Sequence, residues 1–263
     1  MKATVNGIEM YYEIHGREGA PWLTLSHSLA CSVRMWDDQI SSFKDRYRIL
    51  AFDTRGHGAS SAPSGAYTLE GLADDVRELF RHLAIERTHF VGLSMGGMIG
   101  QTFALKYPGM FTSLTLADTT CRYPAEAAPI WADRIRIAEE KGMQPLVQPT
   151  LERWFTEPFR KSQPQVVARV GALIAGTPVA GYVGCSHAIP KINLAARLKE
   201  IRCPILVIVG EQDMGTPVAM AREIHDNAPG SKLVVLANAA HLSNMERPRE
   251  FDRALSEFLS GTP

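Results

Sequence analysis

The chain has 263 residues, of which 45% are hydrophobic and 21% charged, and its 28 Lys and Arg residues balance its 28 Asp and Glu residues. This length suits one large α/β domain with a full hydrophobic core. The balanced charge argues against a nucleic-acid-binding protein, which usually carries a basic excess, and the hydrophobic fraction argues against disorder.

Four cysteines, at positions 31, 121, 185 and 203, form no C-x-x-C pair and have no spacing typical of a zinc or redox site. We expect them to be reduced, as in an intracellular protein. The first residues alternate between apolar and polar and lack the apolar run of a signal peptide, and no stretch is long and apolar enough for a transmembrane helix. The expectation is a cytoplasmic protein that binds neither membranes nor nucleic acid.

The first half of the chain alternates predicted strands and helices. Two short strands are predicted within Met1–Ile14, joined by a tight turn at Asn6-Gly7. Residues Leu69–Leu83 repeat apolar side chains with a helical period and follow Thr68, a residue suited to cap a helix. A further helix is predicted over Met98–Leu105. Buried strands are predicted at Trp22–Ser26, Arg48–Phe52, His89–Leu93 and Leu114–Ala117.

Between about residues 120 and 194 the pattern changes to helical stretches with prolines and no clear strand. Strands and helices then return, at Ile205–Val209, Val218–Asp226, Lys232–Leu236 and Pro248–Leu259. Such alternation implies right-handed crossovers and a mostly parallel sheet. We therefore expect an α/β fold whose eight-stranded sheet has helices on both faces. Its core would comprise residues 1–119 and 195–263, with a helical cap, residues 120–194, inserted after the sixth strand.

A G-x-S-x-G motif, Gly92-Leu93-Ser94-Met95-Gly96, lies between a predicted strand and a predicted helix. In that context it predicts a nucleophile elbow, a sharp turn that lifts the Ser94 hydroxyl clear of the sheet. The flanking glycines would leave room where Cβ atoms would clash, and the N-terminus of the following helix favours developing negative charge. The alternative for the same motif is a glycine-rich turn without chemistry.

A nucleophilic serine needs a base, and after such an elbow the usual order is Ser, then Asp or Glu, then His. His241 is the candidate base, in the loop after the last predicted strand. Asp213 is the candidate acid, with Glu211 and Asp118 as rivals. Ser94, Asp213 and His241 would then lie at the carboxyl edge of one sheet, where open α/β sheets bind ligands. Asp213 would orient the imidazole and stabilise the imidazolium.

Acyl transfer also needs hydrogen-bond donors for the oxyanion. The backbone N–H of Met95, directly after the serine, is one candidate, and that of Leu29, in the loop after the third strand, is the other. Asp53 and His57 belong to a glycine-rich turn after the fourth strand, and we expect structural roles for both.

These motifs resemble the α/β-hydrolase family over the whole chain, and more narrowly the 3-oxoadipate enol-lactonases of the β-ketoadipate pathway. One departure is Ala30, at a position where the family's loop usually ends in glycine, and this would narrow the acyl side of the pocket. The segments that carry the resemblance are residues 25–29, 34–37, 53–60, 92–97, 152–156, 180–185 and 240–246.

The resemblance implies hydrolysis of a small, acid-bearing enol-lactone through an acyl-enzyme on Ser94, without a cofactor. The glycines do not form a dinucleotide-binding motif, so no such cofactor is expected. No group of residues has metal-ligand spacing, so no metal is expected either. The substrate carboxylate would need a cationic partner in the cap. The candidate substrate-binding residues are Ser28, Trp131, Arg134 and Trp154, and the other cap cations are Arg136, Arg153, Arg160, Lys161 and His187.

Other functions fit the same motifs. A broad small-molecule carboxylesterase, or a cofactor-free perhydrolase, would use the same three residues and differ in pocket shape. A carbon–carbon bond hydrolase is a further alternative, and a ligand receptor with vestigial catalysis is another, which negligible turnover would reveal. Serine at position 94 disfavours the dehalogenases and epoxide hydrolases of this fold, which use aspartate there. The sequence leaves a monomer and a homodimer equally open.

Overall fold

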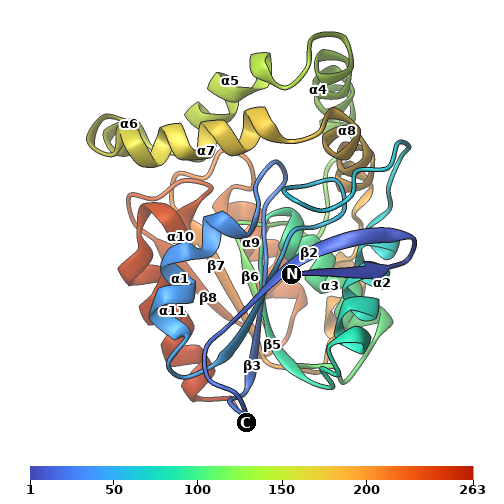
Figure 1. Cartoon of the computed structure of the whole chain (residues 1–263). Helices are drawn as coiled ribbons and strands as arrows, with labels where there is room; N and C mark the ends of the chain where they lie inside the picture. Colours follow the sequence, from blue (N-terminus) through green and yellow to red (C-terminus); the bar gives the residue numbers. More distant parts are fainter. Residues whose placement is uncertain (263) are drawn as a thin grey trace.

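The computed structural model describes residues 1–262, and over that range it contains one eight-stranded sheet (Figure 1). The strand order across the sheet is β1-β2-β4-β3-β5-β6-β7-β8. The β1–β2 and β2–β4 pairs are antiparallel and all others are parallel, which confirms the predicted sheet. The strands are β1 (Lys2–Val5), β2 (Ile8–His15), β3 (Trp22–Ser26), β4 (Arg48–Phe52), β5 (Thr88–Leu93), β6 (Phe111–Ala117), β7 (Ile205–Gly210) and β8 (Lys232–Leu236).

Helices cover both faces of the sheet (Figure 1). Helices α1 and α11 pack together on one face, and α2 and α3 pack together on the other. The helix predicted over 98–105 instead begins at Met95, because Ser94 occupies the position that caps it. The helices of the core are α1 (Asp37–Phe43), α2 (Leu69–His82), α3 (Met95–Lys106), α9 (Val218–Asn227), α10 (Ser243–Glu246) and α11 (Pro248–Ser260), with 3₁₀ turns at Val33–Trp36 and Ala195–Glu200.

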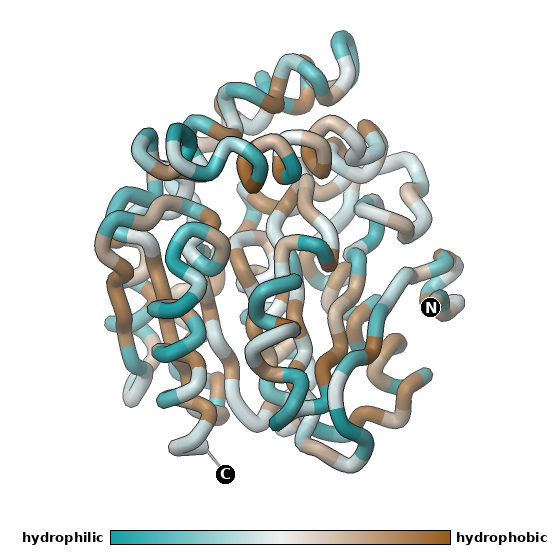
Figure 2. Tube along the Cα trace, turned by 60° about the vertical axis from the view of Figure 1, so that its left-hand side comes forward, coloured by the Kyte–Doolittle hydropathy of each residue, from teal (hydrophilic) through white to brown (hydrophobic). Residues whose placement is uncertain are grey.

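Helix α2 illustrates how the local sequence sets the packing. The Thr68 side chain accepts a hydrogen bond from the Gly71 N–H at 3.0 Å, which confirms the prediction that Thr68 is the N-cap residue of this helix. Its apolar stripe, which includes Leu72, Val76 and Phe80, is buried against the sheet and α3. Burying each such side chain contributes about 1.5–3 kcal/mol. Figure 2 shows that the same separation holds elsewhere in the protein: apolar residues follow the strands, and polar residues lie on the outer sides of the helices.

The segment between β6 and β7 forms a layer of helices above the sheet (Figure 1). Its two ends leave the core side by side, because Arg122 and Asn193 form an isolated β-bridge and the Leu194 N–H donates to the Cys121 carbonyl at 2.8 Å. We propose that residues 120–194 form a cap on the core. Its helices are α4 (Ala127–Lys141), α5 (Gln144–Trp154), α6 (Glu157–Ser162), α7 (Pro164–Gly176) and α8 (Val179–Ala188), followed by a 3₁₀ turn at Ile189–Lys191.

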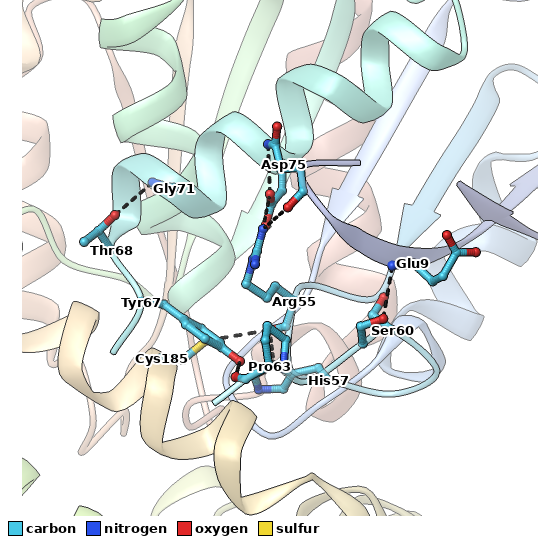
Figure 3. A network of polar contacts seen from close by, with 12 residues as sticks. Glu9, Arg55, His57, Ser60, Pro63, Tyr67, Thr68, Gly71, Asp75 and Cys185 are labelled. Carbon is cyan, nitrogen blue, oxygen red and sulfur yellow. Dashed lines mark hydrogen bonds and ion pairs between the residues drawn. The ribbon is translucent and has the colours of Figure 1, made fainter. Parts of the chain in front are cut away.

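Helix α8 packs closely on the turn that follows β4 (Figure 3). A Cβ atom built on Gly181 would lie 1.9 Å from the Gly56 carbonyl oxygen, so neither backbone tolerates a side chain there. The Tyr67 N–H donates to the Gly184 carbonyl at 3.0 Å, and its ring lies against the same glycine. The small residues of α8 therefore allow the cap and the core to touch backbone to backbone.

Polar contacts hold this turn in place (Figure 3). Arg55 donates from Nε and Nη2 to the two carboxylate oxygens of Asp75 in α2, both at 2.7 Å. Asp53 accepts two backbone N–H groups, both at 2.8 Å. His57 is buried, and its Nδ1 lies 3.2 Å from the Arg55 carbonyl oxygen. These contacts agree with structural roles for Asp53 and His57.

The four cysteines form no disulfide bond with one another, and three of them are buried. Over residues 1–262, no single helix is both long and apolar enough to cross a membrane, although the bent pair Pro164–Gly176 and Val179–Lys191 passes on length and composition together. Within the same range, no three His, Cys, Asp or Glu side chains gather in a way that could hold a metal ion.

Candidate active site

Ser94 lies in a strained turn between β5 and α3. Its φ of 56° and ψ of −115° are unusual for a residue with a side chain and cost about 1–3 kcal/mol. The Thr119 hydroxyl donates to the Ser94 carbonyl oxygen at 2.7 Å and supports the turn. A Cβ atom on Gly92 would lie 2.3 Å from the Gly96 carbonyl oxygen, and one on Gly96 would lie 2.1 Å from the Ser26 carbonyl oxygen. The turn therefore requires both glycines, as the motif predicts.

A cavity of about 170 Å³ lies at the carboxyl edge of the sheet, beneath the cap. Ser94 lines it, and the Ser94 hydroxyl makes no hydrogen bond to another of the described residues, which leaves it available to a ligand. The core contributes Ser28, Leu29, Ala30, Ser94, Met214, Gly215 and His241 to the lining, and the segment after β6 contributes Tyr123, Ala127, Ile130, Trp131, Arg134, Thr150, Arg153, Trp154, Ile174, Tyr182 and Ile189.

His241 and Asp213 form a buried pair beside this cavity. The His241 Nδ1 lies 2.8 Å from the Asp213 Oδ2, and the two side chains are only 5% and 0% exposed. With Nδ1 facing the carboxylate, Nε2 is the nitrogen left to act as the base. His241 lines the same cavity as Ser94, so the structure brings together the three residues predicted as nucleophile, base and acid.

Asp213 is also held by its own loop. The Thr216 hydroxyl donates to Oδ2 at 2.7 Å, and the N–H groups of Gly215 and Thr216 donate to Oδ1 at 2.7 and 2.9 Å. Burial alone would raise the pKa of Asp213, but the charge of His241 and these hydrogen bonds outweigh it and hold the pKa below its ordinary value. The carboxylate is therefore kept ionised and fixed in orientation.

The two rival acids are placed elsewhere. Asp118 accepts hydrogen bonds from the last residue of β7 at 2.8 Å and from the Ser243 hydroxyl. Complete burial, and then repulsion from Asp213, raise the pKa of Asp118 well above its ordinary value. Glu211 is exposed and accepts a backbone N–H after β8 at 3.1 Å. The contact with His241 Nδ1 belongs to Asp213.

The two predicted oxyanion donors are Leu29 and Met95. Met95 is the first residue of α3 and follows Ser94 directly, and Leu29 lines the cavity. Neither N–H donates to an acceptor among the described residues. The N-terminus of α3 adds a partial positive charge beside Ser94. Both groups are thus free to bind a developing oxyanion.

The loop that carries Leu29 is shaped by its neighbours. Ala30 has a φ of 56°, in the left-handed region, which explains why glycine suits this position and why alanine costs about 1–2 kcal/mol there. The His27 Nδ1 lies 2.7 Å from the Ser28 carbonyl oxygen, and its Nε2 accepts the Thr54 N–H at 2.9 Å. Burial lowers the pKa of His27 to about 4, so a neutral ring bridges this loop to the β4 turn.

Two arginines of the cap, Arg134 and Arg153, line one wall of the cavity. Arg134 lies with its guanidinium carbon 4.8 Å from the centre of the Trp131 ring. Burial, and then the charge of Arg134, lower the pKa of Arg153. Among residues 1–262, neither arginine has an acidic partner within ion-pair distance. The cavity therefore contains two uncompensated positive charges.

The other cap cations do not line the cavity. Arg136 pairs with Asp133 and Glu140 on the outer side of α4, and Lys161 pairs with Glu157. Arg160 donates to the carbonyl oxygens of Glu152 and Phe155. His187 lies half-buried in α8 away from the cavity lining. The candidate carboxylate partners are thereby reduced to Arg134 and Arg153.

The aromatic candidates both line the cavity. The Trp154 ring lies 5.7 Å from the His241 ring at an angle of 31°. Trp131 packs edge-on against Tyr123, at 6.1 Å between ring centres. Ser28 also lines the cavity, and its buried hydroxyl has no partner among the described residues.

Several lining or supporting residues were missed at the level of sequence. Tyr123 and Tyr182 belong to the lining, and no motif marks them. Gly215 and Thr216, in contrast, follow Asp213 at the spacing of an Asx turn, so their contacts with the carboxylate could have been predicted.

Comparisons with known proteins show which family the chain is similar to. The family model for the alpha/beta hydrolase fold matches residues 14–248. The 3-oxoadipate enol-lactonase 2 of Acinetobacter baylyi is 36% identical over 252 residues, which cover 96% of this chain and 93% of that protein. An enol-lactonase structure from Burkholderia xenovorans has a TM-score of 0.95 at 36% identity, over 99% of this chain and 100% of that one. A thermophilic esterase from Thermogutta terrifontis, solved with malate bound, has a TM-score of 0.92 at 28% identity, over 99% and 97% of the two chains.

The chain belongs to the α/β-hydrolase family, as the sequence predicts, and it is a hydrolase of the kind that acts on ester bonds. Within that family, its resemblance to the 3-oxoadipate enol-lactonases is confirmed.

Proposed function

We propose that the protein hydrolyses a small lactone that carries a carboxylate, similar to 3-oxoadipate enol-lactone, through an acyl-enzyme on Ser94. One observation carries the proposal: the cavity that contains Ser94 and His241 also contains the unpaired guanidinium groups of Arg134 and Arg153. Arginine can hold a carboxylate through two parallel hydrogen bonds, so this wall favours an anionic substrate.

In the first half of the reaction, the Ser94 hydroxyl attacks the lactone carbonyl while His241 Nε2 takes its proton. The N–H groups of Leu29 and Met95 stabilise the oxyanion. The ring C–O bond then breaks, and the enol oxygen leaves with the proton from His241. An enol is a good leaving group, so this proton transfer is less demanding than it would be for an amide.

In the second half, His241 removes a proton from a water molecule, and the resulting hydroxide attacks the ester carbonyl of the acyl-enzyme. The tetrahedral intermediate collapses, His241 returns the proton to Ser94, and the product leaves as an open-chain diacid. Asp213 stabilises the imidazolium in both halves. No cofactor takes part in this scheme.

Two further points support the proposal. The relatives named above include enol-lactonases, and the esterase structure was solved with malate, itself a small dicarboxylate. Four unpaired cysteines suit a reducing compartment, in keeping with a cytoplasmic catabolic enzyme.

A carboxylesterase of broad range is the second candidate. Ile130 and Met214 line the cavity although they are 55% and 70% exposed, and such an apolar rim suits neutral acyl or alcohol groups. The Thermogutta esterase shares the fold over almost the whole chain.

Initial rates on 3-oxoadipate enol-lactone and on neutral p-nitrophenyl acetate separate the two candidates. We expect Arg153→Met to raise KM for the acid-bearing lactone by about 10–100-fold, the value of one charge-assisted hydrogen bond, and to leave the neutral ester almost unaffected. Arg136→Met, on the outer side of α4, is the control. Equal losses on both substrates, or a preference of the wild type for the neutral ester, would favour the esterase.

A further inference from the structure

Glu246, the last residue of α10, is a buried carboxylate that joins two separate parts of the molecule. The residue is only 5% exposed. Oε2 accepts the Ala240 N–H at 2.9 Å. Oε1 accepts the Thr156 N–H at 3.1 Å and also the Thr156 hydroxyl. One carboxylate therefore bonds the loop that carries His241 to the junction between α5 and α6 in the cap.

A second contact joins the same two segments. The Leu242 N–H donates to the Trp154 carbonyl oxygen at 3.2 Å. The residues on both sides of His241 are thus tied, directly or through Glu246, to cap residues 154–156. Between these ties, the Trp154 ring lies 5.7 Å from the His241 ring. The N–H groups on either side of the imidazole are thus both engaged, that of Leu242 by the cap directly and that of Ala240 by Glu246, which itself binds the cap.

Burying this charge needs an explanation, because Glu246 forms no ion pair within residues 1–262. An ionised carboxylate that loses water must be compensated by hydrogen bonds. Here the compensation comes from three donors, one in the core and two in the cap. A neutral amide in place of the carboxylate could not accept from all three. Glutamine would present an N–H₂ group to one of the N–H donors, so one side of the connection would be lost.

We propose that Glu246 is a positioning residue through which the seating of the cap fixes the orientation of His241. The inference rests on the proposed function, since it takes His241 as the base for Ser94. Glu246 does not touch the substrate or the reacting atoms. Its carboxylate binds both the cap and the loop that carries His241, so a shift of the cap would also change the orientation of the imidazole.

The test measures the rate at which a fluorophosphonate probe labels Ser94 in the intact protein, because this reaction needs an aligned base but no lactone. We expect Glu246→Gln to slow labelling by about 10–100-fold, as a small misplacement of a catalytic group does. On p-nitrophenyl acetate, kcat should fall by a similar factor while KM changes little. Glu250→Gln, an exposed acid on the first turn of α11, is the control and should label at the wild-type rate.

A second pair of variants tests the cap side of the connection. Thr156→Val removes the hydroxyl donor and should slow labelling, whereas Thr156→Ser keeps it and should restore a rate close to that of the wild type. In a Glu246→Gln background, Thr156→Val should have little further effect, because its partner is already altered. This pair decides the question if Glu246→Gln does not fold.

The outcomes are distinguishable. If the wild type is not labelled, or if Ser94→Ala is labelled equally, the proposed serine chemistry is wrong. If the wild type is labelled and the Glu246 and Thr156 variants match its rate, the positioning role is overturned. A lower melting temperature together with an unchanged labelling rate of the folded protein also overturns it, since Glu246 would then serve stability alone.

Discussion

Two buried aspartates near the ends of β6 and β7 show how single residues of one type acquire opposite properties. Asp213 receives hydrogen bonds from Gly215, Thr216 and the imidazole, and these hold its pKa low. Asp118 has fewer donors, is completely buried, and feels the negative charge of Asp213, so its pKa is raised well above the ordinary value. The ionisation of one acid thus favours the neutral form of the other.

This contrast predicts different effects for the same substitution. Asp213→Asn should lower kcat by about 10⁴-fold, because the amide no longer favours the required imidazole tautomer. Asp118→Asn should cost on the order of tenfold or less, since it replaces a carboxyl that is already biased toward its neutral form. Steady-state kinetics on the enol-lactone and on a p-nitrophenyl ester would measure both. A larger loss for Asp118→Asn would mean that the acid has been assigned wrongly.

Ser94 and His241 should behave as one unit. Each alanine substitution is expected to lower kcat by about 10⁵–10⁶-fold, and the double variant should be no worse than either single one. Circular dichroism would show whether the folds survive, and burst kinetics would show whether the acyl-enzyme is lost. Substantial turnover by Ser94→Ala would contradict the mechanism.

At the scale of elements, the direction in which a cap side chain faces depends on how its helix packs, which the sequence does not reveal. Arg134 and Arg136 are two residues apart on α4, and residues at that spacing lie on different sides of a helix. On α4 the two arginines therefore diverge, but only the docking of the helix decides that Arg134 faces the cavity. Ser94, Asp213 and His241 could be predicted because a motif and a fixed chain order mark them. Arg153 and Glu246 could not be singled out, because their partners are brought together by tertiary packing.

The contact between α8 and the turn after β4 gives a prediction at this scale. Gly181→Ala would place a methyl group 1.9 Å from the Gly56 carbonyl oxygen, so one backbone must move. We expect a loss of about 1–3 kcal/mol in the free energy of unfolding and a higher KM, because the cap is displaced. Urea denaturation and steady-state kinetics measure the two effects.

Gly176→Ala is the matched control in α7, where a Cβ atom would meet nothing within 4 Å. It should be neutral or slightly stabilising, since alanine is the better helix former. Similar losses for both variants would show that the close approach to Gly56 is not what limits position 181.

At the scale of the whole molecule, acid stability depends on two buried histidines. The rings of His27 and His57 lie 5.2 Å apart, where the loop that carries Leu29 meets the turn after β4. Burial lowers the pKa of His27 to about 4, and burial together with the neighbouring His27 lowers the pKa of His57 to about 3. Below the ordinary value of 6.5, the unfolded chain therefore binds more protons than the folded one. Their contribution to stability is complete above pH 6.5 and is lost as the pH falls toward these lower values.

Urea denaturation at pH 7.5 and pH 5 tests this sign. The two imidazoles together should reduce the free energy of unfolding by about 4 kcal/mol over that interval. Asp118 acts in the opposite sense through its raised pKa, so a comparison with His57→Gln isolates the histidine share. That variant should lose less stability on acidification than the wild type does. Equal losses for the two proteins would contradict the assignment.

The overall architecture was predictable because strands and helices alternate at regular intervals on both sides of the insertion. The start of α3 was not, since the nucleophile turn leads into the helix without an intervening loop. The helices of the cap have weaker signals, because prolines interrupt their periodicity and Pro149 lies within α5.

We propose that the segment between β6 and β7 is an exchangeable part, because the bridge between Arg122 and Asn193 brings its two ends together. Both of its ends meet at one point, so a chimera could receive a foreign segment there without a break in any strand of the sheet. The graft would bring a new ligand range, provided that it offers a hydroxyl and an N–H where Thr156 now meets Glu246. The replacement would also have to match the close approach of α8 to the turn after β4, where Gly181 meets Gly56.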